Sequence, residues 1–164
     1  MQYVSSLGGP RVLLPTEDIS RWIQAMGPSP SPDDGLYGLA CSVTDYCGVI
    51  DPWGKKILIF GDDPSDMYWL PSPDGGLFFR WIGADSLQQL TDFAKDIARL
   101  GNWTESVLWE ADSEKYTAMD TCSFHGDDAP TIQLNLVPGR YRVDSLYAED
   151  DDVMSIIQKL QRIS

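Results

Sequence analysis

The chain contains a single histidine, His125, and this scarcity restricts the catalytic mechanisms open to it. Any proton transfer by an imidazole must pass through that one residue. Cys122 precedes it, and Asp127 and Asp128 follow, so the segment contains the residue types of a cysteine nucleophile, a base and a carboxylate. Nucleophile and base usually come from distant segments, and this stretch is typical of a polar turn between strands. We therefore expect no catalytic residue here.

Basic residues are few, with 12 Lys and Arg against 25 Asp and Glu, and the formal net charge is -13. Such a charge repels nucleic acid and anionic membranes, so we expect neither as a partner, and we expect a neutral or basic protein instead. No apolar run approaches the roughly 20 residues of a membrane-spanning helix. The first residues lack the basic and apolar regions of a signal peptide.

Cysteines are also few, and their number is odd: Cys41, Cys47 and Cys122. An odd count argues against a disulfide framework and favours a reducing cytoplasm. Together with His125 they would make a zinc set of three cysteines and one histidine, but the separation of Cys41 and Cys47 exceeds that of the usual close ligand pairs. Glycine-rich phosphate loops, nucleophile elbows and dinucleotide fingerprints are absent. We predict no enzyme, no metal and no cofactor.

Short apolar runs separated by Gly, Pro or Asp make up most of the sequence, which is 43% hydrophobic. This pattern predicts antiparallel strands. The turn chemistry of Asp74-Gly75-Gly76 predicts a hairpin just before one of them. The expected strands cover residues 12–14, 39–43, 56–60, 77–82, 107–109, 132–136 and 141–143, with a further strand around Tyr116.

Three segments have the spacing of helix faces. The first starts after a Thr16 cap and ends at Gly27. The second, about 85–100, begins with a capping box in which Asp85-Ser86 are followed by Gln88, and it stops at Gly101. The third is a C-terminal helix, about 152–163, whose apolar stripe consists of Val153, Ile156, Ile157, Leu160 and Ile163.

The proline-rich segment 28–35 is expected to be a loop within a single domain that spans residues 1–164. The predicted fold class is α+β: a mainly antiparallel β-sheet with two to three helices packed on it. The strand order and the oligomeric state do not follow from the pattern.

Six short motifs, taken in their order and spacing, resemble the immunity protein 21 family. They are Ser5–Pro15, Gly61–Pro64, Trp69–Pro71, Asp74–Trp81, Ala84–Ser86 and Pro138–Val143. The resemblance spans about residues 3 to 147. It implies a cytosolic antidote of a bacterial polymorphic toxin system, which protects its producer by binding a cognate toxin domain. It carries no family-wide binding residues onto this chain.

Electrostatics supplies the candidate partner-binding residues. Many toxin domains are basic because they act on nucleic acid, so clustered carboxylates would be steered onto them, and an exposed aromatic side chain would anchor the contact. The candidates are Asp62, Asp63, Asp66, Trp53, Asp127, Asp128, Glu149, Asp150, Asp151 and Asp152.

Each candidate also has a structural interpretation, and two other functions stay open. The aspartates of 62–66 fit a solvated turn, Glu149–Asp152 fit a helix start, and Trp53 fits a hydrophobic plug over a sheet edge. Asp74, Gly75, Gly76 and Arg80 fit a turn and an ion pair. The alternatives to immunity are an acidic adaptor that binds a protein unrelated to toxins, and an enzyme that uses carboxylates.

Overall fold

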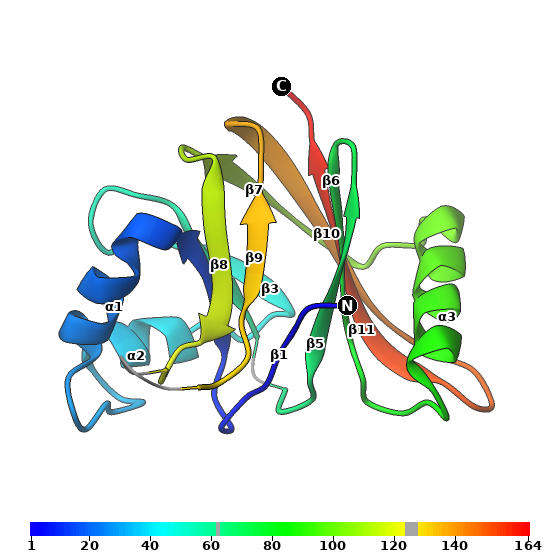
Figure 1. Ribbon diagram of the computed structural model, residues 1–164, viewed down its shortest axis with the longest axis horizontal. Helices are drawn as coiled ribbons and strands as arrows, with labels where there is room; N and C mark the ends of the chain where they lie inside the picture. The colour runs from blue at the N-terminus through cyan, green and yellow to red at the C-terminus, as the bar shows by residue number, and fades with distance from the viewer. Residues whose placement is uncertain (62, 124–127) are drawn as a thin grey trace.

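The computed structural model describes residues 1–61, 63–123 and 128–164. These residues form eleven strands in two antiparallel sheets, with three α-helices (Figure 1). Sheet A has the order β1 (Tyr3–Val4), β5 (Met67–Ser72), β6 (Gly75–Arg80), β11 (Met154–Arg162), β10 (Gly139–Glu149) and β7 (Glu105–Ala111). Sheet B has the order β3 (Cys47–Ile50), β4 (Ile57–Phe60), β2 (Arg11–Pro15), β8 (Lys115–Asp120) and β9 (Ile132–Asn135). The predicted α+β class is confirmed.

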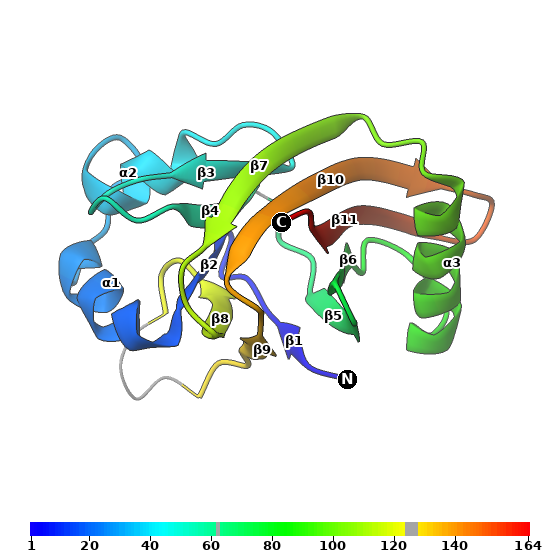
Figure 2. The same cartoon turned by 90° about the horizontal axis from the view of Figure 1, so that it is seen from above.

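The two sheets pack face to face, and helices cover both outer faces (Figures 1 and 2). The helices are α1 (Ile19–Met26) and α2 (Gly35–Cys41) on sheet B, and α3 (Leu87–Leu100) on sheet A. Strand alternation sorts the side chains between layers. On β2, Leu13 enters the core between the sheets, whereas Val12 and Leu14 pack under α1 and α2.

Aromatic side chains fill the core between the sheets. Phe78 of sheet A lies 4.7 Å from Phe60 of sheet B and 4.4 Å from Trp69, measured between ring centroids. Trp109 meets Tyr116 edge-on at 5.1 Å. The contacts of Phe78 with Phe60 and of Trp109 with Tyr116 join the two sheets, through β6 and β7 of sheet A.

Helix caps agree with the sequence at α3 and disagree at α1. The Ser86 hydroxyl accepts a hydrogen bond from the Gln89 amide, and the Gln89 side chain accepts one from the Asp85 amide, so the capping glutamine is Gln89 and not Gln88. Gly101 ends the helix in a left-handed conformation. Thr16 does not cap α1. Its hydroxyl is hydrogen-bonded to that of Thr117, and a 3-10 turn, Thr16–Asp18, precedes the helix.

The predicted hairpin is present between β5 and β6, and its two turn residues are Pro73 and Asp74. Gly75 follows in β6 with φ of 143°, a conformation that favours glycine. A Cβ atom at Gly75 would also collide with the carbonyl oxygen of Leu160 in β11. The glycine therefore permits the close approach of two strands rather than the turn itself.

The C-terminal helix predicted over residues 152–163 is wrong, because residues 154–162 form strand β11. β11 lies at the centre of sheet A between β6 and β10, and both of its faces are covered. Leu160 points into the core between the sheets, whereas Ile157 packs under α3. With both faces buried, the strand loses the alternation of a half-exposed strand, and its apolar residues acquire a helix-like spacing.

The strand predicted over residues 39–43 is also wrong, since residues 35–41 form α2. Leu36 and Ala40 lie one helical turn apart, and both pack against the outer face of sheet B. The segment 39–43 is short and apolar, and such runs do not distinguish a buried strand from a buried helix turn.

Candidate partner-binding surface

Most of the candidate aspartates lie in loops on one edge of the sandwich, the lower edge in Figure 1, where they are spread along the longest dimension of the molecule. We call this set of loops the acidic loop end, and define it by residues 27–34, 42–46, 63–66, 81–86, 128–131 and 150–153. None of the 12 Lys and Arg residues lies in these loops. Their charged residues are all aspartates: Asp33, Asp34, Asp45, Asp63, Asp66, Asp85, Asp128, Asp150, Asp151 and Asp152.

Two buried arginines support this end from inside. Arg80 donates from Nη1 to the carbonyl oxygen of Gly61 at 2.9 Å and from Nη2 to that of Tyr46 at 3.4 Å. Arg11 donates from Nη1 to the carbonyl oxygen of Asp63 at 2.6 Å, and from Nη2 to that of Ser65. Both side chains are almost completely buried. They hold the backbone of the loop before β3 and of the loop after β4 in place, so the aspartates of these two loops project from a fixed frame.

The β10–β11 hairpin carries the largest acidic run. Asp150 builds the turn, because its Oδ1 atom accepts hydrogen bonds from the amides of Asp152 at 2.9 Å and Val153 at 2.8 Å. Glu149 accepts a hydrogen bond from the Tyr147 hydroxyl, and this contact raises the pKa of Tyr147. Asp151 and Asp152 are exposed, and among the described residues their carboxylates have no partner.

The predicted helix start at Glu149–Asp152 is therefore a hairpin turn, and the acidic run has a different structural role from the one expected. Of the run, only Asp150 has a carboxylate that shapes the turn. The charges of Asp151 and Asp152 are directed to solvent at the tip of a long two-stranded ribbon.

Of the other aspartates predicted to bind a partner, the structure describes the positions of three, Asp63, Asp66 and Asp128. Asp63 and Asp66 lie half-exposed in the β4–β5 loop, where the Asp63 carboxylate accepts a hydrogen bond from the Ser65 amide. Asp128 is exposed. Asp62 and Asp127 lie outside the described residues.

The structure does not bring Trp53 to the acidic loop end. Trp53 lies in the β3–β4 loop, at the opposite end of the sandwich (Figure 1). It is half-buried: its ring lies edge-on to Trp22 of α1 at 6.2 Å, and the Arg21 guanidinium lies 4.3 Å from its ring centroid. This is the packing expected of a hydrophobic plug. A partner contact at Trp53 stays a prediction, separate from the acidic loop end.

Four aspartates of the acidic loop end were missed by the sequence reasoning: Asp33, Asp34, Asp45 and Asp85. Each is exposed. Asp45 reaches this end because the Gly61 amide donates to the Tyr46 carbonyl oxygen at 2.9 Å, which joins the loop before β3 to the loop after β4. No local signal marks these residues, because only the strand topology brings their loops together.

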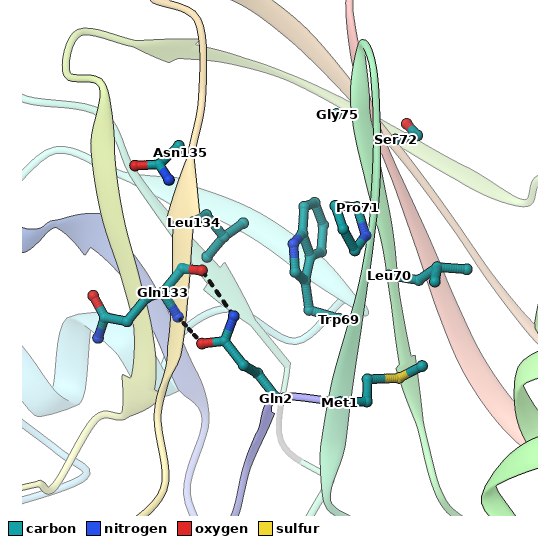
Figure 3. A pocket seen from close by; sticks show the side chains of 10 residues that line it. All are labelled: Met1, Gln2, Trp69, Leu70, Pro71, Ser72, Gly75, Gln133, Leu134 and Asn135. Carbon is teal, nitrogen blue, oxygen red and sulfur yellow. Dashed lines mark hydrogen bonds between the residues drawn. The ribbon is translucent and has the colours of Figure 1, made fainter.

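A groove opens on one side of the sandwich, between β9 of sheet B and the β5–β6 hairpin of sheet A (Figure 3). Its volume is about 860 Å³. Trp69 and Leu134 form its apolar floor, and the side chain of Gln2 crosses its lower part to reach the backbone of Gln133. Among the described residues that line this groove, none has a charged side chain, in contrast to the acidic loop end.

The three cysteines do not share one site. Cys47 lies in the core between the sheets, where burial raises its thiol pKa, whereas Cys122 packs on the outer face of sheet B. Cys41 and Cys122 both contact the hydroxyl of Tyr37. Within the described residues, no group of three His, Cys, Asp or Glu side chains is placed to hold a metal ion. No described helix is long and apolar enough to cross a membrane.

Comparison with known proteins adds one decisive match. Residues 2–153 match the model of the family described as immunity protein 21. The chain belongs to the immunity protein 21 family. No curated protein and no solved structure matches the chain.

The immunity protein 21 match covers all of sheet B and every loop of the acidic loop end, up to Val153. The resemblance inferred from the six short motifs is confirmed. Membership in an immunity protein family supports a role in protection against a toxin.

Proposed function

We propose that this protein binds a cognate toxin domain in the cytoplasm of the producing cell and neutralises it without catalysis. The acidic loop end covers the functional surface of the toxin by steric and electrostatic occlusion. Family membership supports the toxin as the partner. The observation that carries the proposed surface is that the charged residues of six loops along one edge of the sandwich are all aspartates.

The proposed partner is basic at the surface that it presents. Grouped aspartates repel one another in the free protein, and a cationic partner relieves that repulsion when it binds. The same field steers a basic partner toward the correct face and raises the association rate. The net charge of -13 adds a long-range attraction with the same sign.

The central proposed contacts are made by carboxylates that have no internal partner. Asp128, Asp151 and Asp152 are exposed, and among the described residues no hydrogen bond or ion pair engages their side chains. Such carboxylates can accept paired hydrogen bonds from arginine side chains of the toxin.

The proposed set also contains carboxylates of other kinds. Asp63, Glu149 and Asp150 each accept an internal hydrogen bond and would use their remaining acceptor capacity. Asp66 belongs to the set, as do Asp62 and Asp127, which lie outside the described residues.

The test uses a candidate toxin domain, taken from a toxin-like reading frame directly beside the gene of this protein. Its dissociation constant is measured by calorimetry at low and high salt for the wild type and for two double variants. Asp128→Lys with Asp151→Lys changes two loops of the acidic loop end. Asp74→Lys with Glu114→Lys makes the same charge change at the opposite end, where both side chains are exposed.

We expect tight binding by the wild type that weakens with salt, and a loss of about tenfold or more for the first double variant. The control should lose much less, because only the long-range field changes. A toxin domain that the wild type does not bind would overturn the proposed function. Equal losses in the two double variants would overturn the proposed surface.

A further inference from the structure

The sandwich is closed along one side and open along the other. On the closed side β3 of sheet B approaches β7 of sheet A, and the Tyr46 amide donates to the Glu105 carboxylate at 3.0 Å. On the open side β9 is the last strand of sheet B, and β1 and β5 are the last strands of sheet A. The N-terminal segment closes only the lower half of this opening. The groove of Figure 3 is the upper half.

The side chain of Gln2 shows what chemistry the free edge of β9 accepts. The Gln133 amide donates to Gln2 Oε1 at 2.8 Å, and Gln2 Nε2 donates to the Gln133 carbonyl oxygen at 3.1 Å (Figure 3). These are the two hydrogen bonds that a residue of a neighbouring strand would make. The carboxamide therefore occupies one position of the β9 edge as a substitute for a peptide group.

The next outward-facing position on this edge is Asn135. The Leu136 amide donates to the Glu114 carbonyl oxygen at 2.9 Å, in the direction of β8. Since the backbone groups of successive strand residues alternate in direction, those of Gln133 and Asn135 both point away from β8. Asn135 is exposed, and among the described residues no group takes the place beside it that Gln2 takes beside Gln133.

The opposite wall cannot pair in the same way. The Trp69 amide already donates to the Gln2 carbonyl oxygen at 3.3 Å, and two residues later Pro71 has no amide hydrogen. An extended segment in the groove would therefore pair with β9 and contact β5 only through side chains. Trp69 and Leu134, which are 6% and 3% exposed, leave an apolar floor for one inserted side chain.

We propose that the groove is a strand-addition site, which binds an extended, uncharged segment of a partner polypeptide. The segment pairs with the Asn135 backbone as an additional strand of sheet B and places an apolar side chain over Trp69 and Leu134. The absence of charged side chains from the lining selects an uncharged segment. That the segment belongs to the toxin rests on the proposed function, whereas the site itself rests on the geometry of β9.

The test probes the full chain with a displayed library of random short linear peptides, and the retained peptides are then synthesised. Asn135→Pro removes the outward amide hydrogen without touching the ladder to β8, and proline is tolerated on sheet edges. Asn135→Ala is the matched control, because it keeps the amide and removes only the side chain. We expect Asn135→Pro to lower peptide affinity about tenfold or more, and Asn135→Ala to change it by less than about twofold.

A second measurement needs no variant. In the wild type, the hydrogen exchange of the Asn135 amide, followed by NMR, should slow markedly when the peptide is added. Peptides that bind Asn135→Pro as well as the wild type, an Asn135 amide that exchanges at the same rate, or a library from which nothing is retained would each overturn the site.

The toxin domain then separates this proposal from the proposed function. A toxin that binds the wild type and loses affinity for Asn135→Pro supports both. Equal binding to the wild type and Asn135→Pro overturns strand addition by the toxin and leaves the acidic loop end as its surface. A toxin that does not bind the wild type overturns the proposed function, and the peptide measurements alone then decide the groove.

Discussion

Arg80 donates a hydrogen bond from its buried guanidinium to the carbonyl oxygen of Gly61, 2.9 Å away, at the start of the β4–β5 loop. The same guanidinium also reaches the Tyr46 carbonyl oxygen. One side chain of sheet A thus fixes two loops that belong to sheet B. The arrangement ties these two loops of the acidic loop end to the folded core.

Replacing this arginine should therefore destabilise the whole fold. We expect Arg80→Met to lower the free energy of unfolding by about 2–4 kcal/mol, because buried carbonyl oxygens lose a charged donor. Arg140→Met, at an exposed position, should change it by less than about 0.5 kcal/mol. Urea denaturation followed by tryptophan fluorescence measures both. Equal stabilities of the two variants would contradict the structural role of Arg80.

The C-terminal strand gives a test that separates strand from helix. Ile157 is fully buried in β11, whereas Ile163, on the same apolar stripe in the helical interpretation, is 46% exposed. Ile157→Ala should cost about 2–5 kcal/mol of stability, and Ile163→Ala should cost far less. A C-terminal helix would bury both residues and give similar losses. Thermal or urea unfolding of the two variants distinguishes these outcomes.

The strands that could be predicted from local sequence are those with a clear pattern, such as a short apolar run bounded by turn residues. Residues 57–60 form a short β-branched and apolar run bounded by turn residues, and they form β4 as expected. β11 was mistaken because its two buried faces abolish the alternating pattern. The segment 39–43 was mistaken because an apolar run of that length suits either structure. Both errors arise where tertiary burial, and not local preference, decides the conformation.

The functional surface could be predicted only in pieces. The aspartates around residues 63, 128 and 150 were visible as separate clusters, but their common location at one end depends on strand order. The groove was not predictable, since Gln2, Trp69 and Leu134 come from three distant segments, and the motif Trp69–Pro71 by itself indicates no groove. These three residues lie close together only because the two sheets pack against each other.

The free energy of unfolding at alkaline pH should depend on Tyr116, which is buried in the core between the sheets. Burial raises the pKa of Tyr116 well above its ordinary value, so the unfolded chain ionises first as pH rises. The contribution of the neutral Tyr116 phenol to the free energy of unfolding is therefore complete below pH about 10. Above that pH it is lost, by up to roughly 1.4 kcal/mol per pH unit. Tyr116→Phe should lose stability less steeply in urea titrations above pH about 10. Parallel slopes would contradict this assignment.

Thiol reactivity should follow the positions of the cysteines. Cys47 is 2% exposed in the core between the sheets, whereas Cys41 and Cys122 are partly exposed. We expect a thiol-specific reagent to modify Cys41 and Cys122 in the native protein and Cys47 only after unfolding. Burial raises the pKa of Cys122, so its modification should accelerate as pH rises. Mass spectrometry of the labelled peptides measures this order, and early labelling of Cys47 would contradict it.

The exposed aspartates of the β10–β11 hairpin should lower the melting temperature of the free protein and raise its affinity for the toxin. No hydrogen bond of the described turn uses the Asp151 carboxylate, whereas the Asp150 carboxylate accepts two amide hydrogen bonds. Asp151→Asn removes one charge from a repelling group, so it should raise the melting temperature at low salt. The same change should weaken toxin binding, by roughly two- to tenfold, because a contact and part of the steering field are lost.

Asp150→Ala is the matched structural variant of the same hairpin. It should lower the melting temperature, because the turn loses both amide hydrogen bonds, and this loss should persist at high salt. The effect of Asp151→Asn on stability should disappear at high salt, since it is purely electrostatic. A gain in stability that survives high salt would show that this carboxylate is not repelled by its neighbours. A toxin affinity unchanged by Asp151→Asn would show that the carboxylate is not used in binding.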